Sequence, residues 1–563
     1  MASILTDEEI LSMINNGDFL LSDEDFGLNS GSDSLGEGDS ADDDCDQNNI
    51  VEQNIANQSP ASLTETDLAS PQISRENNYN WSTCRPQVID IPFSETPGLK
   101  IFPKGNDPID YFNLFVTNTF WEFLVEEANS YAVEVFLNSD RSNSRISTWK
   151  NTDVVEMKKF IALLFHTGTI RVNRLEDYWK TNELFNFHIF RSTMSRNRFM
   201  LLLRVLHFCK NPGQNDNPTS RLHKIDKMTN YFNKTMEELY QPSKNLSIDE
   251  SMVLFRGRLM FRQYIKNKRH KYGIKLYMMT ESWGLVHRVL IYSGEGTGTS
   301  EELSHTEYVV EKLMEGYYYK GHSIYMDNYY NSVKLAHYLL EKQTYCTGTL
   351  RANRKNNPKA INDKKLKKGE TICQYTEKGV GVVKWKDRRD VIAISSEHSH
   401  DLVNITNRKG IIKSKPLSII KYNEYMSGID RQDQMLSYYP CERKTLRWYK
   451  KLGIHFIQIL LLNSYLLYNK NVKKISFYDY RLKIISTILN SGENNITKRQ
   501  PTNNNALHFS KKVPKNKNNK IMYKRCKLCS SKGVRKMTSF YCSMCEDEPG
   551  FCLDCFEEFH RSI

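Results

Sequence analysis

Basic residues are missing from the N-terminal region of this chain: residues 1–74 contain 17 Asp or Glu and no Lys or Arg. The segment is also poor in aromatic residues, so it buries too little apolar surface to offset the entropy lost on ordering. We therefore expect residues 1–95 to form a disordered acidic region. Within it, the amphipathic stretch Glu8–Leu21 is either a partner-binding helix or a section of a solvated acidic tail.

The chain also lacks a run of about 18 apolar residues, the length that suggests a membrane span. Its first residues, MASILTDEEILSM, lack the basic region and apolar core of a secretory signal. Leu452–Tyr468 is the longest apolar stretch, but His455, Gln458 and Asn463 interrupt it, which favours a buried helix. With 39% hydrophobic residues and a mean hydropathy of −0.58, the composition excludes a membrane protein as a class.

Charge is unevenly distributed along the 563 residues. The whole chain carries +12, but the region after residue 74, with 78 basic and 49 acidic residues, carries +29. Such a basic body favours binding to a polyanion, because phosphates release counterions when Lys and Arg neutralise them. Charge alone does not distinguish DNA from RNA. The length predicts three or four structural units with a substantial core.

Hydrophobic periodicity divides the body into a helical region and a mixed region. Apolar residues recur every three or four positions between Pro108 and Lys210, which predicts packed amphipathic helices. From Leu246 the pattern becomes strand-like. The expected order is three strands, then a helix, a strand, a helix and a strand, at residues 246–255, 272–282, 285–294, 305–317, 322–328, 331–343 and 344–350. This order predicts a mixed α/β sheet with helices packed on it.

Two later segments are strongly basic. Arg351–Asp390 holds 13 Lys or Arg against 5 Asp or Glu, which favours an inserted basic subdomain over a strand of the sheet. Helical spacing returns in Tyr422–Tyr439 and Trp448–Asn469. Lys498–Arg525 has nine Lys or Arg and no acidic residue, which is typical of a flexible linker, a nuclear-localisation signal or a segment that contacts the DNA backbone.

Four aspartates are candidate catalytic residues because of their surroundings. Asp249 lies within an apolar strand, Asp327 ends a later one, and Asp430 and Asp433 share a face of a predicted helix. A carboxylate within an apolar strand is costly unless it is paired or bound to a metal. Carboxylates that converge from two strands and a helix would bind hard divalent ions and support in-line phosphoryl transfer. For each aspartate alone, a strand-end cap or salt bridge is the alternative.

The sequence blocks around these aspartates resemble those of the piggyBac transposase family. SIDESM, YMDNYYNS, GTLRANRK and YMSGIDRQDQMLSYY occur in the family's order between Pro108 and Tyr468. The resemblance implies an RNase H-like catalytic domain with an insertion, flanked by a split helical dimerisation and DNA-binding domain. It also implies Asp249, Asp327 and Asp430 as ligands of Mg²⁺ or Mn²⁺, and Asp433 as a further essential residue.

The implied reaction is cut-and-paste transposition of double-stranded DNA through strand nicking, hairpin formation and integration at TTAA. The resemblance further implies a homodimer that acts in the nucleus. We expect no binding to membranes. Trp448 matches the family's tryptophan against the target-site bases, with core packing as the alternative. Further candidates for DNA contacts come from the basic run after Asp249 and from the start of the insertion; they are Arg256, Arg258, Arg262, Lys268, Arg269, Arg351, Arg354 and Lys355.

Cysteine is sparse in the body but clustered at the C-terminal end. Six of the 12 cysteines form three C-x-x-C pairs, followed by a histidine: Cys526, Cys529, Cys542, Cys545, Cys552, Cys555 and His560. This spacing predicts zinc binding in a segment that folds with its metal, with two ions in a cross-braced arrangement. Cys526, Cys529, Cys552 and Cys555 would hold one ion. The other three would hold the second, with Asp554, Asp547 or His508 as open choices for its fourth ligand.

Together these features predict a multidomain α/β plus α protein in eight segments. They are the acidic region 1–95, a first helical segment 96–243, a first catalytic segment 244–353, the basic insertion 354–416, a second catalytic segment 417–440, a second helical segment 441–497, the basic linker 498–525 and the zinc domain 526–563. Two alternatives to an active transposase remain: a domesticated transposase that binds DNA or chromatin without cutting, and an adaptor whose cysteine-rich end recruits a protein.

Overall fold

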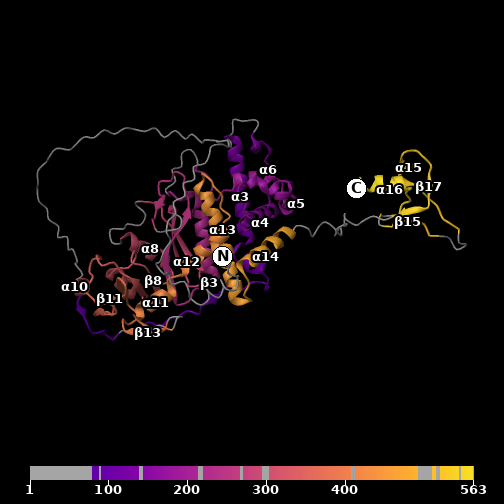
Figure 1. Ribbon diagram of the computed structural model, residues 1–563. Helices are drawn as coiled ribbons and strands as arrows, with labels where there is room; N and C mark the ends of the chain where they lie inside the picture. Colours follow the sequence, from indigo (N-terminus) through magenta and orange to yellow (C-terminus); the bar gives the residue numbers. More distant parts are fainter. Residues whose placement is uncertain are drawn as a thin grey trace, which may run out of the picture. The chain divides into compact units, whose positions relative to one another are not determined.

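The computed structural model describes residues 79–87, 90–138, 144–212, 220–266, 271–294, 304–406, 410, 412–491, 510–514, 520–543, 545 and 547–561. They belong to two compact units, Met1–Asn490 and Ser491–Ile563 (Figure 1). Most of the expected acidic region and much of the basic linker lie outside the described residues. Each unit is considered below by itself.

Helices from two distant regions of the sequence form one layer of the first unit. The earlier helices are α2 (Pro108–Phe115), α3 (Asn118–Leu137), α4 (Val154–Thr169), α5 (His188–Thr193), α6 (Arg196–Val205) and α7 (His223–Leu239), with the short 3-10 helices η1 (Arg145–Thr148), η2 (Leu175–Trp179) and η3 (Glu183–Phe185). The later ones are α13 (Trp448–Asn471) and α14 (Phe477–Asn490). Because α13 packs on α2 and α7 while α14 packs on α2 and α4, the two regions share one hydrophobic core.

Local sequence signals explain where these helices begin. Thr117, Asp153 and Ser195 each accept a hydrogen bond from a backbone N–H in the first turn of α3, α4 and α6, as N-cap residues do. Helix α13 is the one described helix long and apolar enough to cross a membrane, and 94% of its apolar window is buried within the protein. This burial is typical of a core helix and agrees with the interruption of the apolar stretch by polar residues.

Ten strands form one large mixed sheet in the order β1-β10-β11-β12-β9-β8-β4-β6-β5, with β7 also paired to β6. Their bounds are β1 (Trp81–Ser82), β4 (Asn245–Leu254), β5 (Gln263–Tyr264), β6 (Tyr272–Thr280), β7 (Val286–Ile291), β8 (Ser323–Met326), β9 (Tyr345–Thr349), β10 (Thr371–Thr376), β11 (Gly381–Lys386) and β12 (Asp390–Ser395). Strands β4, β8 and β9 are parallel, and the other pairings are antiparallel. The strands and helices expected between residues 246 and 350 are confirmed.

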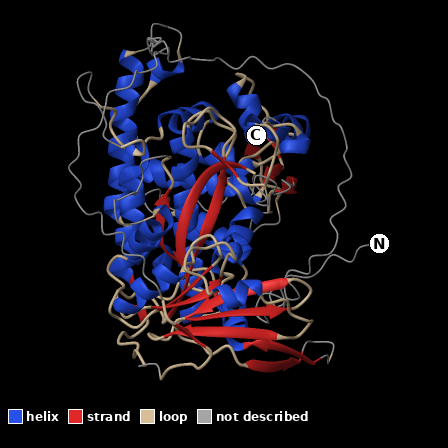
Figure 2. Cartoon of the chain, turned by 90° about the vertical axis from the view of Figure 1, so that its left-hand side faces the viewer, coloured by secondary structure: helices blue, strands red, loops and turns tan. Residues whose placement is uncertain are grey.

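Different helices cover the two faces of this sheet (Figure 2). Helices α8 (His305–Met314) and α9 (Val333–Glu341) share a core with the β4 face that carries Leu246 and Ile248. Helices α11 (Leu417–Tyr425) and α12 (Gly428–Tyr438) pack on the strands, α12 on β4 and α11 on β9 and β12. The stretch 422–439 was expected to be helical; the helix is interrupted between Tyr425 and Gly428.

One expectation about the sheet is wrong. The basic segment Arg351–Asp390 was expected to be an inserted subdomain without strands of the sheet, but it contains β10 and β11, which extend the sheet through β12. Val382 and Val383 are buried, and the buried Lys384 of the same strand donates to the carbonyl oxygens of Asn362 and Lys364 at 3.1 and 2.8 Å. The expectation was wrong because it relied on the number of charged residues and disregarded the apolar residues between them.

The remaining elements of the first unit are small. Two short strands, β2 (Gly98–Leu99) and β3 (Tyr240–Gln241), pair with each other, and α10 (Lys359–Asp363) packs beside β10 and β11. Strands β13 (Leu402–Thr406) and β14 (Ile412–Pro416) form a two-stranded ribbon that leads directly into α11.

The second unit is small and built around its cysteines. It contains β15 (Ser510–Lys512), β16 (Lys524–Arg525), α15 (Lys527–Ser531), β17 (Met537–Thr538), β18 (Phe540–Cys542) and α16 (Leu553–Arg561). Its buried core consists of Phe551 and four cysteines, with few apolar residues around them. So small a core gives little stability by itself, and small domains of this kind generally need a bound metal to supply the rest.

Candidate active site and cysteine clusters

Asp249 and Asp327 lie next to each other at the carboxyl ends of two parallel strands. Ile248 of β4 is opposite Met326 of β8, and the aspartates are the residues that follow. Neighbouring strands are about 4.8 Å apart, and residues in the same register point to the same face. Met326 is also opposite Gly348 of β9, which brings Thr349 into the same row. Pairing of the strands therefore brings the two carboxylates together.

Each of these carboxylates is oriented by a local hydrogen bond. Asp249 Oδ1 accepts from the backbone N–H of Glu250 at 2.8 Å, and Asp327 Oδ1 accepts from that of Tyr329 at 2.8 Å. The second bond closes an Asx turn that ends β8. Both side chains are only partly buried, so the site remains open to solvent.

The helix that carries the other two aspartates lies tightly on β4. A Cβ at Gly428, the first residue of α12, would be closer to Thr280 Oγ1 and to the carbonyl oxygen of Glu281 than real Cβ contacts allow. Further along the helix, Asp433 accepts a hydrogen bond from Ser251 Oγ at 2.5 Å. Ser251 is two residues beyond Asp249 and shares its face. Helix α12 is therefore anchored on both sides of Asp430.

The phenol of Tyr422 is near enough to the three carboxylates for the negative charge of each to act on it. Burial raises the pKa of Tyr422 most, and the negative charges of Asp327, Asp249 and Asp430 raise it further. The residue is on α11, three positions before Tyr425, whose ring packs at a tilt of 37° against the ring of Tyr325 of β8, with 4.8 Å between centroids. Helix α11 thus crosses above the row that contains Asp327. Sequence reasoning missed this tyrosine, because a tyrosine in a helix gives no signal of its own.

The oxygen ligands of this site suit hard divalent cations such as Mg²⁺ or Mn²⁺. The three aspartates do not belong to a described set whose ligand atoms all lie within 4.8 Å of one another. Asp249, Asp327 and Asp430 supply only carboxylate oxygens, so their chemistry fits a divalent cation of this kind.

Two small or polar residues that the sequence analysis did not identify hold the turn behind Asp327. Asn331 is fully buried, and its Nδ2 donates to the carbonyl oxygens of Met326 at 2.8 Å and of Thr349 at 3.0 Å. Gly348 leaves space for this arrangement, since a Cβ there would overlap the Met326 carbonyl and the Asn331 amide. The asparagine in YMDNYYNS was the available signal, because buried amides are normally hydrogen-bonded.

The arginines after Asp249 lie on an exposed loop. Arg256, Arg258 and Arg262 are all exposed, and Arg262 donates to the carbonyl oxygens of Arg256 and Gly257 at 2.9 and 3.1 Å. Lys268 and Arg269 lie outside the described residues. The loop therefore presents cationic side chains to solvent, as contacts with a polyanion require.

The arginines at the start of the basic segment lie beside the turn after Asp327. Arg351 Nε donates to Asn328 Oδ1 at 3.0 Å, and Arg354 donates to the carbonyl oxygens of Asn328 and Tyr329. Burial, and secondarily the charge of Arg351, lower the pKa of Arg354. Lys355 is exposed. Both arginines thus support the turn after Asp327 and bring positive charge to it.

Trp448 is half-buried at the first position of α13. Its ring contacts the ring of Phe261 edge to face at 5.2 Å, which joins α13 to the exposed arginine loop. The side chain therefore packs on the core while some of its surface remains accessible, which is compatible with both of its expected roles.

The C-terminal unit brings the cysteines together in two groups. Cys526, Cys529, Cys552 and Cys555 form a four-ligand set, and Cys542, Cys545 and His560 form a three-ligand set. Their pairing is cross-braced, as the spacing predicts. The Sγ atoms of Cys529 and Cys555 are 3.4 Å apart and those of Cys526 and Cys552 are 3.8 Å apart. Tetrahedral zinc with Zn–S bonds of about 2.3 Å implies about 3.8 Å between sulfurs.

In the second group, a contact with the backbone orients the histidine towards a cysteine. His560 Nε2 is 3.2 Å from Cys545 Sγ, and its Nδ1 is 2.7 Å from the carbonyl oxygen of Phe556. A bond from Nδ1–H to that carbonyl would leave Nε2 as the ligand atom, the usual arrangement of metal-binding histidines. Among the described residues no fourth member joins this set. His508 lies outside the described residues, and the Asp554 side chain is 91% exposed.

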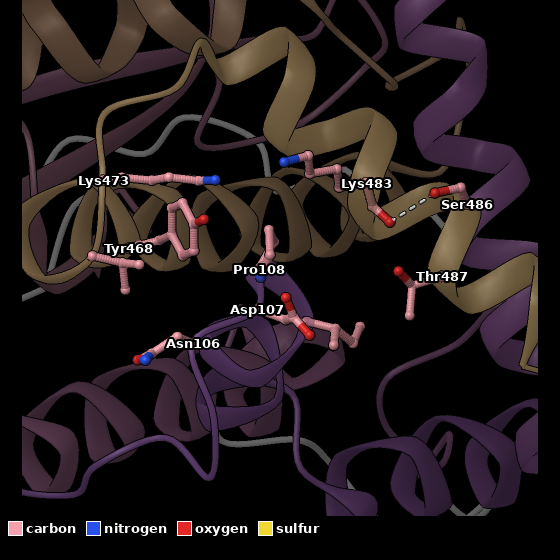
Figure 3. A pocket seen from close by; sticks show the side chains of 10 residues that line it. Asn106, Asp107, Pro108, Tyr468, Lys473, Lys483, Ser486 and Thr487 are labelled. Carbon is pink, nitrogen blue, oxygen red and sulfur yellow. Dashed lines mark hydrogen bonds between the residues drawn. The ribbon is translucent and has the colours of Figure 1, made fainter.

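A cavity of about 470 Å³ lies elsewhere in the first unit, between α2, α13 and α14. Figure 3 shows Lys473 and Lys483 on one side of it and Asp107 on the other. No aspartate of the candidate active site lines it. The open row of carboxylates at the end of the strands is therefore distinct from this cavity.

Comparison with known proteins identifies the family. A family model described as Transposase IS4 matches residues 107–465, so the chain belongs to this transposase family. Within it, the chain is of the piggyBac type: it is 23% identical over 443 residues to human PiggyBac transposable element-derived protein 3, covering 74% of this chain and 72% of that protein. Human PiggyBac transposable element-derived protein 2 is 24% identical over 409 residues, or 69% and 64% of the two chains.

A solved structure shows the same fold. The cryo-EM structure of the piggyBac transposase synaptic complex with hairpin DNA matches this chain with a TM-score of 0.61 and 27% identity. The match covers 72% of this chain and 86% of that one. The mixed α/β architecture described above is thus that of a transposase, and the match supports DNA as the ligand of this chain.

Proposed function

We propose that this protein is a cut-and-paste DNA transposase that nicks the ends of its element, forms hairpins and integrates at TTAA. The observation that carries the proposal is the in-register pairing of β4 with β8, which sets Asp249 beside Asp327 under a helix bearing Asp430 and Asp433. The strand order β7-β6-β4-β8-β9, antiparallel and then parallel, supports an RNase H-like assignment for the catalytic region. Similarity to a transposase solved with hairpin DNA supports the same conclusion.

In this proposal each aspartate has a defined task. Asp249, Asp327 and Asp430 hold divalent ions, and Asp433 fixes α12 on β4 through Ser251. The ions, when bound, supply activation of the attacking oxygen and stabilisation of the leaving oxygen. Water first attacks a backbone phosphorus, and the broken P–O bond leaves a 3′-OH. That hydroxyl then attacks a phosphodiester of the opposite strand, which joins the strands as a hairpin and releases the flanking 3′-OH.

Positive charge around the carboxylates would reduce their repulsion of the phosphates of a DNA substrate. Phosphates are repelled by aspartates unless cations lie close by. Arg351 and Arg354 flank the turn after Asp327, and Arg256, Arg258 and Arg262 line the loop after β4. We further propose a nuclear homodimer, with the basic segment 498–525 as its localisation signal or DNA-backbone contact and zinc-stabilised recognition of transposon ends by the second unit.

The test uses a duplex with the element's own terminal repeat next to TTAA, incubated with Mg²⁺ and either wild type or Asp249→Ala. We expect nicks and hairpins from the wild type alone. Tight binding by both proteins without cleavage would instead favour a transposase-derived protein that binds DNA or chromatin. Binding of the cysteine-rich unit to a nuclear protein and not to DNA would favour the adaptor.

A further inference from the structure

The ribbon formed by β13 and β14 stands apart from the hydrophobic cores of the first unit. Leu402, Val403 and Ile412 are 45%, 39% and 66% exposed. No apolar residue of these two strands belongs to a core cluster of the described residues. An isolated two-stranded hairpin is marginally stable in water, so contact with a partner would stabilise this exposed arm.

The register of the ribbon gives it two chemically different faces. Val403 is opposite Lys415 and Ile405 is opposite Lys413, so both lysines lie on one face. The other face carries Leu402 opposite Pro416, Asn404 opposite Ser414 and Thr406 opposite Ile412, and it has no charged residue. The lysines are two residues apart, about 6.8 Å along the strand. Neither takes part in an ion pair within the described residues, and the described strands contain no acidic residue.

The ribbon is joined directly to the helix above the carboxylates. Pro416 ends β14 and Leu417 begins α11, whose first turn is tied back by bonds from Leu417 N to the Asp401 carbonyl and from Ser418 N to that of Ser399. Tyr422 is six residues beyond Pro416, or about 9 Å along a helix. Helix α11 also packs against β14 of the ribbon. A polyanion held at the carboxylates would therefore pass near the ribbon.

We infer that the β13–β14 ribbon is an arm that binds the backbone of duplex DNA through Lys413 and Lys415. A two-stranded ribbon is one of the two structures that the major groove, about 12 Å wide, admits. Charge favours DNA over a second copy of this chain, since pairing two such ribbons would bring like charges together. The inference rests on the proposed function, because it specifies how the same DNA substrate is held.

The experiment measures binding of the full-length protein to a duplex of arbitrary sequence, without divalent ions, between about 50 and 200 mM salt. The variant is Lys413→Gln/Lys415→Gln. The control, Lys234→Gln/Lys378→Gln, removes two exposed lysines that already face Glu238 and Glu341. For two lost phosphate contacts, the slope of log affinity against log salt should decrease by about 1.8. The control should retain the wild-type slope.

An unchanged slope in the ribbon variant, with normal wild-type binding and cleavage, would overturn this inference and leave the proposed function intact. An altered sedimentation coefficient of that variant with an unchanged slope would also overturn it, in favour of a second copy as the partner. Failure of the wild type to bind or cleave DNA would instead contradict the proposed function. Equal melting temperatures of both variants establish that folding is not the cause.

Discussion

Asp327 combines a structural and a chemical task in one side chain. One oxygen accepts the backbone N–H of Tyr329 and ends β8, while the partly exposed carboxylate faces the proposed metal site. Asparagine keeps an oxygen for the turn but loses the negative charge. The two tasks are therefore separable by a single substitution.

Asp327→Asn should reduce DNA cleavage by more than about 100-fold. Loss of a residue that only supports a metal ligand reduces activity by about 10- to 100-fold, and loss of the ligand itself should reduce it further. Binding of end DNA should remain nearly unchanged, since the basic surfaces are intact. Gel assays of nicking and anisotropy titrations on the same preparation check both outcomes. Equal cleavage by variant and wild type would disprove the metal-site assignment.

Gly428 determines how closely α12 approaches the sheet. Because its neighbours include the backbone carbonyl of Glu281, a methyl group there can be accommodated only if the helix moves. Gly428→Ala should lower the free energy of unfolding by about 1–3 kcal/mol, as overpacking does, and should displace Asp430.

Denaturant unfolding and the cleavage assay together measure this effect. Ser427→Ala is the matched control, because Ser427 precedes the same helix and makes no side-chain cap bond. It should behave nearly as wild type. If Gly428→Ala were as stable and as active as Ser427→Ala, close approach of α12 would be unimportant for the site.

At the level of secondary-structure elements, the sequence predicted the strands and helices that have a regular apolar pattern. It did not predict a strand in which apolar and charged residues are mixed. Strands β4, β6, β7, β8 and β9 and the helices between them follow simple periodicities, which identified them in the sequence. In β11 valines and lysines share one strand, and counting charge concealed Val382 and Val383. The break before α12 depends on tight contact with Thr280 and Glu281, which are about 150 residues away in sequence.

The aspartates illustrate the same limit within the site. Their unusual positions in the sequence identified them, but only strand pairing brings Asp249 beside Asp327. Tyr422 and Gly348 gain their importance from neighbours elsewhere in the chain, so their residue types alone gave no prediction. Asn331 offered a signal, as an amide in the block YMDNYYNS, because buried amides are normally hydrogen-bonded.

The cysteine unit should depend on metal for its fold. Its core consists largely of cysteines, so removal of zinc by a chelator should abolish the ordered structure of residues 520–561 while the first unit remains folded. Heteronuclear NMR of the labelled protein follows both units. Cys529→Ser should reproduce this loss, whereas Cys84→Ser, at an exposed cysteine in the first unit, should not. Retained dispersion after chelation would contradict the role of zinc.

At the scale of the whole first unit, buried histidines predict a pH-dependent stability. Burial lowers the pKa of His207 to about 3 and the pKa values of His322 and His400 to about 4. An unfolded histidine has a pKa of about 6.5, so between these values the unfolded state binds more protons. Stability should therefore decrease as pH falls from about 6.5 towards 4.

Melting temperatures measured between pH 7.5 and 5 check this prediction. The expected result is a steady decrease below about pH 6.5. His400→Gln removes one of the titrating groups while keeping a side chain able to bond Ser418 Oγ, and should flatten the decrease. A higher melting temperature at pH 5 than at pH 7 would contradict the burial argument.

The shared helical core also has a consequence for how the protein is made. Helix α4 ends at Thr169, but α14, which packs on it, ends at Asn490, about 320 residues later. At about 5–20 residues per second, a ribosome needs roughly 15 to 65 seconds to synthesise that interval. During this time the apolar faces of the early helices remain uncovered, because α13 and α14 have not yet been synthesised. We therefore expect the nascent chain to need chaperones and prematurely terminated products that end before α13 to aggregate.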